Sequence, residues 1–583
     1  MNAPEPVAEV KFLKGFWGGW ISVVGLFLLP CFLLAQIIPR EAGSSRSYAE
    51  VIESYQALDK AFANARLDSI GLTDSGRPLH LFLMGQHLPE VFETPANDQL
   101  VLLINNGIHP GESCGIDASV QWAEALLQSG QLPQDLLIAI IPVYNVHGLL
   151  HRKAHTRANQ NGPELQGFRG NGRNLDLNRD FVKAEALNTR AFHQLYTLLD
   201  PDIFIDTHTS NGADYPYTMT LIATQEDKLA PPLASFMKEV FTPALYAGME
   251  QKTWPMIPYV NVFGRPPDAG MSAFLETPRY ASGYSSLHHS LGYITEAHML
   301  KSYEARVAAT QAFLEVLLPL AERERKKLME VREQARKWSA EAQQFPINWK
   351  LDSSAVEALP FRKYAYQYPE SRLGDYHRLQ YLQDESTIAL PYYPRYRATE
   401  HGSPPSGYII PQAWREIVER LRDMGVQMHP LPNDSSLQVE SIYLQQPSFA
   451  SQPYEGRFLL TEFEELRKME ERQFLRGDWW IACDENNRYL LTTLLEPKGV
   501  DSFVRWGFFL SIYQRKEYFS TYVFEDTAEE LLAEDAALRA EFAAWKDAHP
   551  EEAKNPYAVL DFIYRRSDYF EDVYQRYPVA RIP

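Results

Sequence analysis

A histidine and a glutamate stand three residues apart just after a strongly apolar stretch. The segment His109-Pro110-Gly111-Glu112 follows LVLLINNGI, so a ring nitrogen and a carboxylate can face one ion. A second apolar stretch, PDIFIDTHTS, leads to His208 in the same way. Two histidines and one glutamate leave a fourth position open for water, as a catalytic rather than a structural zinc requires. We predict one zinc ion per chain, held by His109, Glu112 and His208.

A further carboxylate lies in a third apolar stretch. Glu296 stands in GYITEAHML, near the end of an expected strand. A carboxylate beside a zinc-bound water can accept its proton and later deliver it to a leaving amine. Glu296 is therefore the candidate general base and acid.

The elements that must position these residues are strands that are apolar throughout, separated by helices. Leu100–Ile104, the 137–146 region and Ile203–Asp206 are such strands, and IDASVQWAEALLQSG is an amphipathic helix between them. Strands of this kind form parallel or mixed sheets covered on both faces. We expect an α/β fold in which a mixed central sheet carries helices on both faces, with candidate residues at the carboxyl ends of its strands.

The amino-acid composition and the expected secondary structure change along the chain. The α/β region is expected over 45–320, and a charge-rich helical connector over 321–344. Residues 345–583 read as an accessory α+β region of one or two subdomains, with short Tyr- and Pro-rich strands first and a helical end.

The N-terminal segment indicates export. Lys11 and Lys14 precede the apolar run from Gly15 to Leu34, which predicts a signal peptide over 1–35 and a periplasmic or extracellular protein. The run is also long enough to span a bilayer uncleaved, so a membrane anchor stays open. With 56 basic against 75 acidic residues, the net charge of −19 argues against nucleic-acid binding, and the sequence leaves the oligomeric state open.

Five blocks in a fixed order resemble the zinc carboxypeptidase family of carboxypeptidase A-like metallopeptidases. They are TDSGRPL, HPGES, NLDLNRDF, FIDTHTSNG and YITEAHM, and the resemblance covers roughly 45–320. It implies a zinc-exopeptidase-like catalytic domain in which His109, Glu112 and His208 bind zinc and Glu296 is the general base and acid.

The resemblance also implies roles for residues between these blocks. Asn178 and Arg179 match the pair that grips the carboxylate of the substrate, and Asp176 matches the acid that orients the first zinc histidine. An arginine that polarises the scissile carbonyl is Arg157, with Arg152 as the alternative. The substrate-binding tyrosine is assigned to Tyr284, with Tyr280 as the rival.

The function expected from these residues is hydrolysis of peptide bonds by an exported metallocarboxypeptidase, through zinc-water attack. Two alternatives stay open. One is a zinc deacylase of N-acyl amino acids, of the aspartoacylase kind, which shares the H-x-x-E…H set. The other is a non-catalytic protein that binds peptide or glycan through the region after 345.

Overall fold

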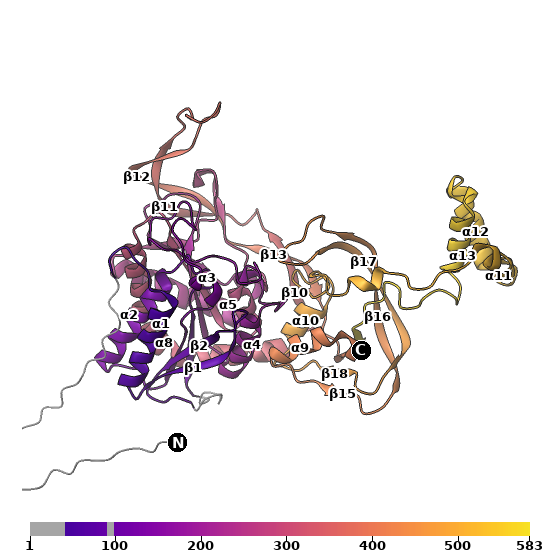
Figure 1. The fold of residues 1–583 in the computed structure, drawn as a ribbon, viewed down its shortest axis with the longest axis horizontal. Helices are drawn as coiled ribbons and strands as arrows, with labels where there is room; N and C mark the ends of the chain where they lie inside the picture. The colour runs from indigo at the N-terminus through magenta and orange to yellow at the C-terminus, as the bar shows by residue number, and fades with distance from the viewer. Residues whose placement is uncertain (1–40, 90–97) are drawn as a thin grey trace, which may run out of the picture.

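The computed structural model describes residues 41–89 and 98–583 (Figure 1). An eight-stranded sheet, in the order β1-β2-β4-β3-β5-β9-β6-β7, forms the centre of the first part of the chain. Strands β4, β3, β5 and β9 run parallel, while the β1–β2, β2–β4 and β9–β6 pairs are antiparallel. The sheet is thus mixed, and the predicted α/β class is confirmed. Its strands are β1 Ala65–Leu72, β2 Pro78–Met84, β3 Leu100–Asn105, β4 Leu136–Ile141, β5 Ile203–Ser210, β6 Met219–Ala223, β7 Met256–Pro258 and β9 Leu291–His298.

Both faces of this sheet are buried. Successive side chains along a strand point to opposite sides, and each side has its own hydrophobic cluster. On β3, Leu103 belongs to one hydrophobic cluster, while Leu102 and Ile104 belong to another. On β5, Phe204 lies on the first face and Ile205 on the second. Every residue of β3, β4 and β5 is buried, which is why these strands read as continuous apolar runs.

Helices cover the sheet. Ser47 caps the first helix, where its side chain accepts from the backbone N–H of Glu50 and the Glu50 carboxylate accepts from that of Ser47. The second helix begins at Cys114, directly after the HPGES segment. The helices of this part are α1 Tyr48–Ala61, α2 Cys114–Ser129, α3 Val146–Leu150, α4 Leu187–Leu199, α5 Pro231–Phe236, α6 Thr242–Gln251, α7 Ala281–Ser286 and α8 Tyr303–Glu341.

The stretch expected as a connector is the second half of α8. Its side chains are not all solvated: Leu328, Val331 and Ala335 repeat at helical spacing and are buried in the core with α2. The boundaries proposed between domains stay a prediction.

Three smaller sheets are built from the rest of the chain together with β8 of the first part. They are β10–β13, β11–β12–β8 and a six-stranded sheet in the order β15-β18-β14-β19-β16-β17. Their strands are β8 Met271–Ser272, β10 Phe345–Leu351, β11 Glu357–Gln367, β12 Gln380–Tyr393, β13 Tyr396–Gly402, β14 Gly407–Ile410, β15 His429–Pro430, β16 Ser435–Phe449, β17 Leu460–Phe474, β18 Trp479–Ala482 and β19 Ala580–Ile582.

One hydrophobic cluster joins this later region to the central sheet. It contains Leu103 and Phe204 from the sheet together with Tyr408, Leu491 and Trp506 from beyond residue 400. Helices α9 Arg415–Asp423 and α10 Arg488–Leu495 contribute buried side chains to the same cluster. The later region is therefore fixed against the sheet by a shared core.

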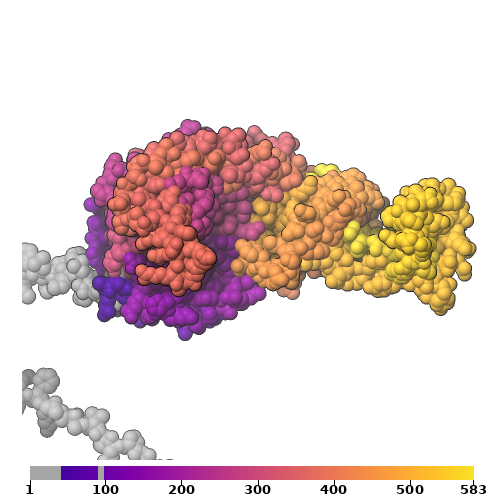
Figure 2. Space-filling model, turned by 90° about the horizontal axis from the view of Figure 1, so that it is seen from above, coloured from indigo at the N-terminus to yellow at the C-terminus, as the bar shows by residue number. Residues whose placement is uncertain are grey.

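The three last helices are set apart. Helices α11 Thr521–Glu534, α12 Ala536–Ala548 and α13 Pro556–Tyr564 pack on one another around Phe524, Leu538 and Leu560. Figure 2 shows them as a separate lobe at one end of the molecule.

The apolar N-terminal run lies outside the described residues, so the structure does not address the predicted signal or anchor. Over 41–89 and 98–583, no helix combines the length and the apolar composition needed to cross a bilayer.

The contact between α2 and β5 leaves no room for a side chain at Gly115. A Cβ there would lie 2.0 Å from Thr207 Oγ1, next to His208. Gly115→Ala should lower the thermal unfolding midpoint, because overpacking a filled core costs about 1–3 kcal/mol. Ala125→Ser, exposed on the same helix, is the control and should change stability by less than about 0.5 kcal/mol. Equal midpoints for the two variants would contradict the close packing.

Candidate metal centre and cavity

The metal-binding candidates meet at the carboxyl edge of the parallel strands. His109 and Glu112 lie in the loop between β3 and α2, where the Glu112 N–H donates to the His109 carbonyl at 2.8 Å. His208 lies on β5, inside the strand rather than after it. Glu296 is its register partner on β9. Adjacent strands lie roughly 4.8 Å apart, so these four residues share one edge of the sheet.

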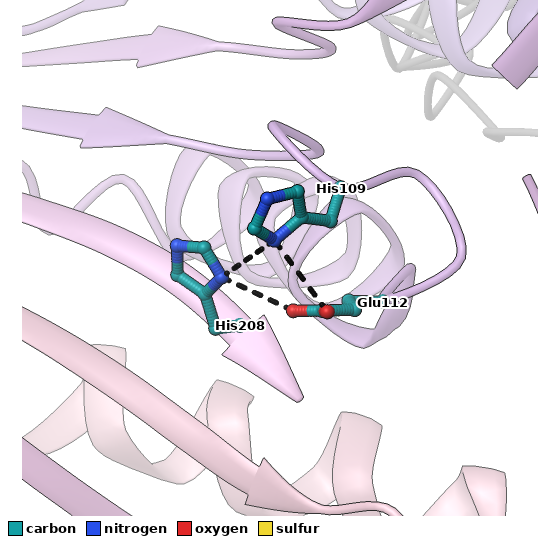
Figure 3. A group of neighbouring side chains, drawn as sticks. All are labelled: His109, Glu112 and His208. Carbon is teal, nitrogen blue, oxygen red and sulfur yellow. Dashed lines mark hydrogen bonds and ion pairs between the residues drawn. The ribbon is translucent and has the colours of Figure 1, made fainter. Parts of the chain in front are cut away.

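The three candidate ligands point toward one another (Figure 3). His109 Nδ1 lies 3.2 Å from His208 Nδ1, and Glu112 Oε2 lies 3.1 Å from His208 Nδ1. All three side chains are buried. Among the described residues, they form the one group of three or more His, Cys, Asp or Glu side chains that can hold a metal ion.

The outer nitrogen of each histidine is bound by a carboxylate. His109 Nε2 donates to Asp176 Oδ1 at 2.8 Å, and His208 Nε2 donates to Asp206 Oδ2 at 2.8 Å. A carboxylate can only accept, so both Nε2 atoms carry protons, and a ring that holds no second proton turns a lone pair inward at Nδ1. Two lone pairs and the Glu112 carboxylate then face one point, which requires a cation there. The residues present fit a divalent metal.

The close approach of these side chains shifts the pKa values of His208 and Glu112. Burial opposes charge on His208, but Asp206 and Glu112 outweigh it and raise its pKa well above the usual value. Burial likewise opposes charge on Glu112, but Arg157 and the histidines hold its pKa well below the usual value. A proton on His208 Nδ1 thus fills the place of a cation, and metal binding would displace it.

Beside this group lies a cavity of about 370 Å³. Its lining includes the three candidate ligands and Glu296, so the predicted residues share one chamber. The other polar or aromatic residues around it are Arg157, Arg169, Asn178, Arg179, Thr209, Ser210, Asn211, Tyr259, Asn261, Phe263, Phe274 and Tyr280.

Glu296 differs from the buried acids around it. Among the described residues, none donates a hydrogen bond to its carboxylate, which lies partly open to the cavity. Burial is the main cause that raises its pKa to about 7, with His208 pulling the other way. An acid of this kind can exchange a proton near neutral pH.

Of the two candidate arginines, only Arg157 reaches the cavity. Its Nη1 donates to Glu112 Oε1, and its Nη2 donates to the Thr209 carbonyl at 3.1 Å. Arg152 instead donates to the carbonyl of Ser45 at 2.6 Å.

Arg169, which was not predicted from the sequence, lines the same cavity. Its Nε donates to Asp176 Oδ2 at 2.9 Å, and its Nη1 lies 3.3 Å from Glu112 Oε1. The segment FRGNGRN carries no periodic pattern, so nothing in the sequence singled out this arginine.

Asn178 and Arg179 also reach the cavity. Asn178 Oδ1 accepts from the Ala281 N–H at 3.0 Å, and the Arg179 guanidinium lies 4.4 Å from the centre of the Tyr280 ring. Asp176 N-caps this short helical turn by accepting from the Asn178 N–H at 2.9 Å. One carboxylate thus positions both His109 and the Asn178-Arg179 pair.

The assignment of Tyr284 needs correction. Tyr284 is fully buried in the hydrophobic core, where its ring stacks on His193 at 4.6 Å, and it does not line the cavity. Its rival Tyr280 precedes α7 in an extended conformation and does line the cavity. Helix α7 turns Tyr284 toward the core, so Tyr280 is the tyrosine available to a ligand.

The carboxylate behind His208 yields a test of the metal group. In Asp206→Asn, one oxygen becomes an NH₂ group, which cannot serve both His208 Nε2 and Asn105 Nδ2 as the carboxylate does. Metal affinity, measured by competition with a chelator, should fall about 10- to 100-fold. The control is Asp214→Asn, which changes an acid bound to His298 Nε2 outside the group. Unchanged affinity in Asp206→Asn would contradict the proposed orientation of His208.

Comparison with known proteins supports one part of the sequence interpretation. No protein-family model matches the chain. The "Carboxypeptidase 2" proteins of Trichophyton tonsurans and Trichophyton equinum are each 32% identical to it over 106 residues, which is 18% of this chain and 19% of theirs. The chain therefore aligns with about a fifth of the length of these curated relatives.

Solved structures of metallo-carboxypeptidases are also found. A metallo-carboxypeptidase from Burkholderia cenocepacia is 18% identical, with a TM-score of 0.37, over 48% of this chain and 70% of that one. Carboxypeptidase A from Helicoverpa armigera is 15% identical, also with a TM-score of 0.37, over 49% and 75%. Over one segment of 106 residues, then, the chain is similar in sequence to proteins named carboxypeptidase, and for that segment the expected resemblance to carboxypeptidases is confirmed.

Proposed function

We propose that this protein is a zinc-dependent metallopeptidase that removes residues from the carboxyl end of peptides. The observation that carries the proposal is the shared cavity. It brings together a buried metal-binding group, a free carboxylate at Glu296 and the Arg179 guanidinium. Each is a part that such hydrolysis needs: an electrophile, a proton carrier and a holder for a terminal carboxylate.

Zinc fits the spacing of the group. With zinc–nitrogen bonds of about 2.0–2.1 Å, two nitrogen ligands of a tetrahedral zinc lie about 3.3 Å apart. The two Nδ1 atoms lie 3.2 Å apart. When bound, zinc would polarise a water molecule and the scissile carbonyl.

Glu296 would move the proton. Its carboxylate accepts from no described residue, so it is free to take a proton from water and return it to the departing amine. Because His208 and Glu296 are register partners on β5 and β9, the proton acceptor stands directly beside the metal group.

Arginine side chains would stabilise the developing negative charge. Arg157 and Arg169 both bind Glu112, which fixes their guanidinium groups at the wall of the cavity. Fixed donors of this kind act where an oxyanion forms. Arg157 was the residue predicted for this role, and Arg169 joins it as a second candidate.

Arg179 would bind the terminal carboxylate of the substrate. Arginine offers a planar fork that matches a carboxylate. Three arginines line the cavity beside two glutamates, which favours an anionic substrate. Tyr280, stacked on Arg179, would pack against the terminal residue. We propose peptides as substrates and retain export as part of the proposal, on the strength of the N-terminal sequence.

The role of Glu296 can be tested with Glu296→Gln. The amide cannot accept the proton, so turnover should fall by about two orders of magnitude or more while metal content stays constant. Turnover of a peptide with a free carboxyl end is the measurement, beside elemental analysis. Glu315→Gln, which removes an acid from a surface pair with Lys252, is the matched control. Near-normal turnover in Glu296→Gln would assign the proton transfer to another group.

The role of Arg179 can be tested with a peptide and its carboxyl-terminal amide. A charged hydrogen bond contributes about 1.5–3 kcal/mol, so the free acid should be cleaved about 10- to 100-fold better. Arg179→Ala should remove this preference, and Arg179→Lys should restore part of it.

The control for this test is Arg173→Ala, because Arg173 lies in the same segment and binds the Glu185 carbonyl instead. Equal rates for acid and amide in the unmutated protein would argue against a carboxypeptidase. Faster hydrolysis of N-acyl amino acids than of peptides would favour the deacylase alternative.

A further inference from the structure

A tight turn from the later part of the chain reaches the candidate substrate site. Strands β16 and β17 are joined by residues 450–459, within which Tyr454 and Arg457 exchange backbone hydrogen bonds of 2.9 and 3.0 Å. The two residues between them, Glu455 and Gly456, have φ angles of 48° and 81°. Positive φ at both central residues is typical of a two-residue β-hairpin loop with a type I′ turn. We refer to it as the 454–457 turn.

Several contacts hold the 454–457 turn in place. Arg457 Nε donates to Glu185 Oε1 at 2.5 Å, and its guanidinium lies 3.5 Å from the centre of the Phe508 ring. The Tyr454 ring stacks on Trp506, whose side chain is almost completely buried in the shared core. The turn is therefore anchored at both ends by rigid parts of the fold.

Two side chains of the turn bind the segment that carries Arg179. Arg179 Nε donates to the Tyr454 hydroxyl at 3.1 Å. The Asp176 N–H donates to Glu455 Oε2 at 2.7 Å. Both bonds join residues more than 270 positions apart in the chain.

These bonds determine which donors of Arg179 stay free. Its Nε is taken by Tyr454, and its Nη1 donates to the Asn178 carbonyl at 2.7 Å. Its Nη2 has no hydrogen-bond partner among the described residues, and the side chain lines the cavity. With Nε and Nη1 each holding a partner and the Tyr280 ring on one face, the guanidinium presents Nη2 to a ligand.

We propose that the 454–457 turn is a specificity element of the substrate site, with Tyr454 as a positioning residue that holds Arg179 in the orientation that binds a terminal carboxylate. The proposal rests on the carboxylate-binding role proposed above for Arg179. A guanidinium already held in one orientation loses less conformational freedom on binding, so the free-acid substrate gains and the amide does not. Glu455 supports the same segment through Asp176.

The test compares KM and kcat for a peptide and its carboxyl-terminal amide in the full-length protein and in Tyr454→Phe. The variant loses one hydroxyl and keeps the ring that stacks on Trp506. KM for the free acid should rise about three- to tenfold, in line with the loss of one hydrogen bond. The value of kcat should change less than twofold, and the amide should be unaffected.

Tyr443→Phe is the matched control, because it removes a hydroxyl that binds Glu470 on the same pair of strands. It should leave both substrates unchanged. A second variant, Glu455→Ala, removes the acceptor for the Asp176 N–H. Like Tyr454→Phe, it should raise KM for the free acid. A rise confined to the acid in either variant supports the proposal.

Three outcomes would overturn it. Unchanged KM in both variants would make the 454–457 turn a structural contact only. An equal rise for acid and amide would show general loosening of the site. Equal rates of hydrolysis of the acid and the amide by the unmutated protein would contradict the role of Arg179, and this proposal with it. If that activity still depended on metal, the proposal of metal-dependent hydrolysis would stand.

Discussion

Three acceptors of hydrogen bonds face one another at the carboxyl edge of the central sheet, and much of the surrounding structure serves that arrangement. Asp176 and Asp206 each take the outer proton of a histidine, which leaves the inner nitrogens 3.2 Å apart with the Glu112 carboxylate beside them. Unpaired, such a group is costly to bury, so a proton or a metal must lie between its members. Arg157 and Arg169 offset part of the negative charge from the cavity side.

The fold makes this arrangement rigid by building it from one loop and two neighbouring strands, all of them buried. His208 and Glu296 are register partners on β5 and β9, while His109 and Glu112 close the loop that leads into α2. The later region packs on the same sheet through a shared core, and its 454–457 turn contacts Arg179, which lines the cavity. The candidate metal group thus comes from the central sheet, while the contact that holds Arg179 comes from beyond residue 400.

The parts of this arrangement that the sequence predicted are those carried by local patterns. Fully buried strands read as apolar runs, and the residues that end or follow them, His109, His208 and Glu296, could be placed at one edge from that pattern alone. Tyr284 was assigned wrongly because the direction of a six-residue helix depends on what it packs against. Arg169 lies in an aperiodic loop, and Tyr454 meets Arg179 across 275 residues, so only the tertiary structure could place them.

We propose that His109, His208 and Glu112 hold one metal ion through their inward-facing atoms. Anomalous diffraction at the zinc absorption edge, from crystals of the protein incubated with zinc, tests it most directly. We expect one strong peak, about 2.0–2.2 Å from both Nδ1 atoms and from the Glu112 carboxylate. A peak at the Nε2 atoms or elsewhere in the molecule, or no peak with the three side chains ordered, would contradict it.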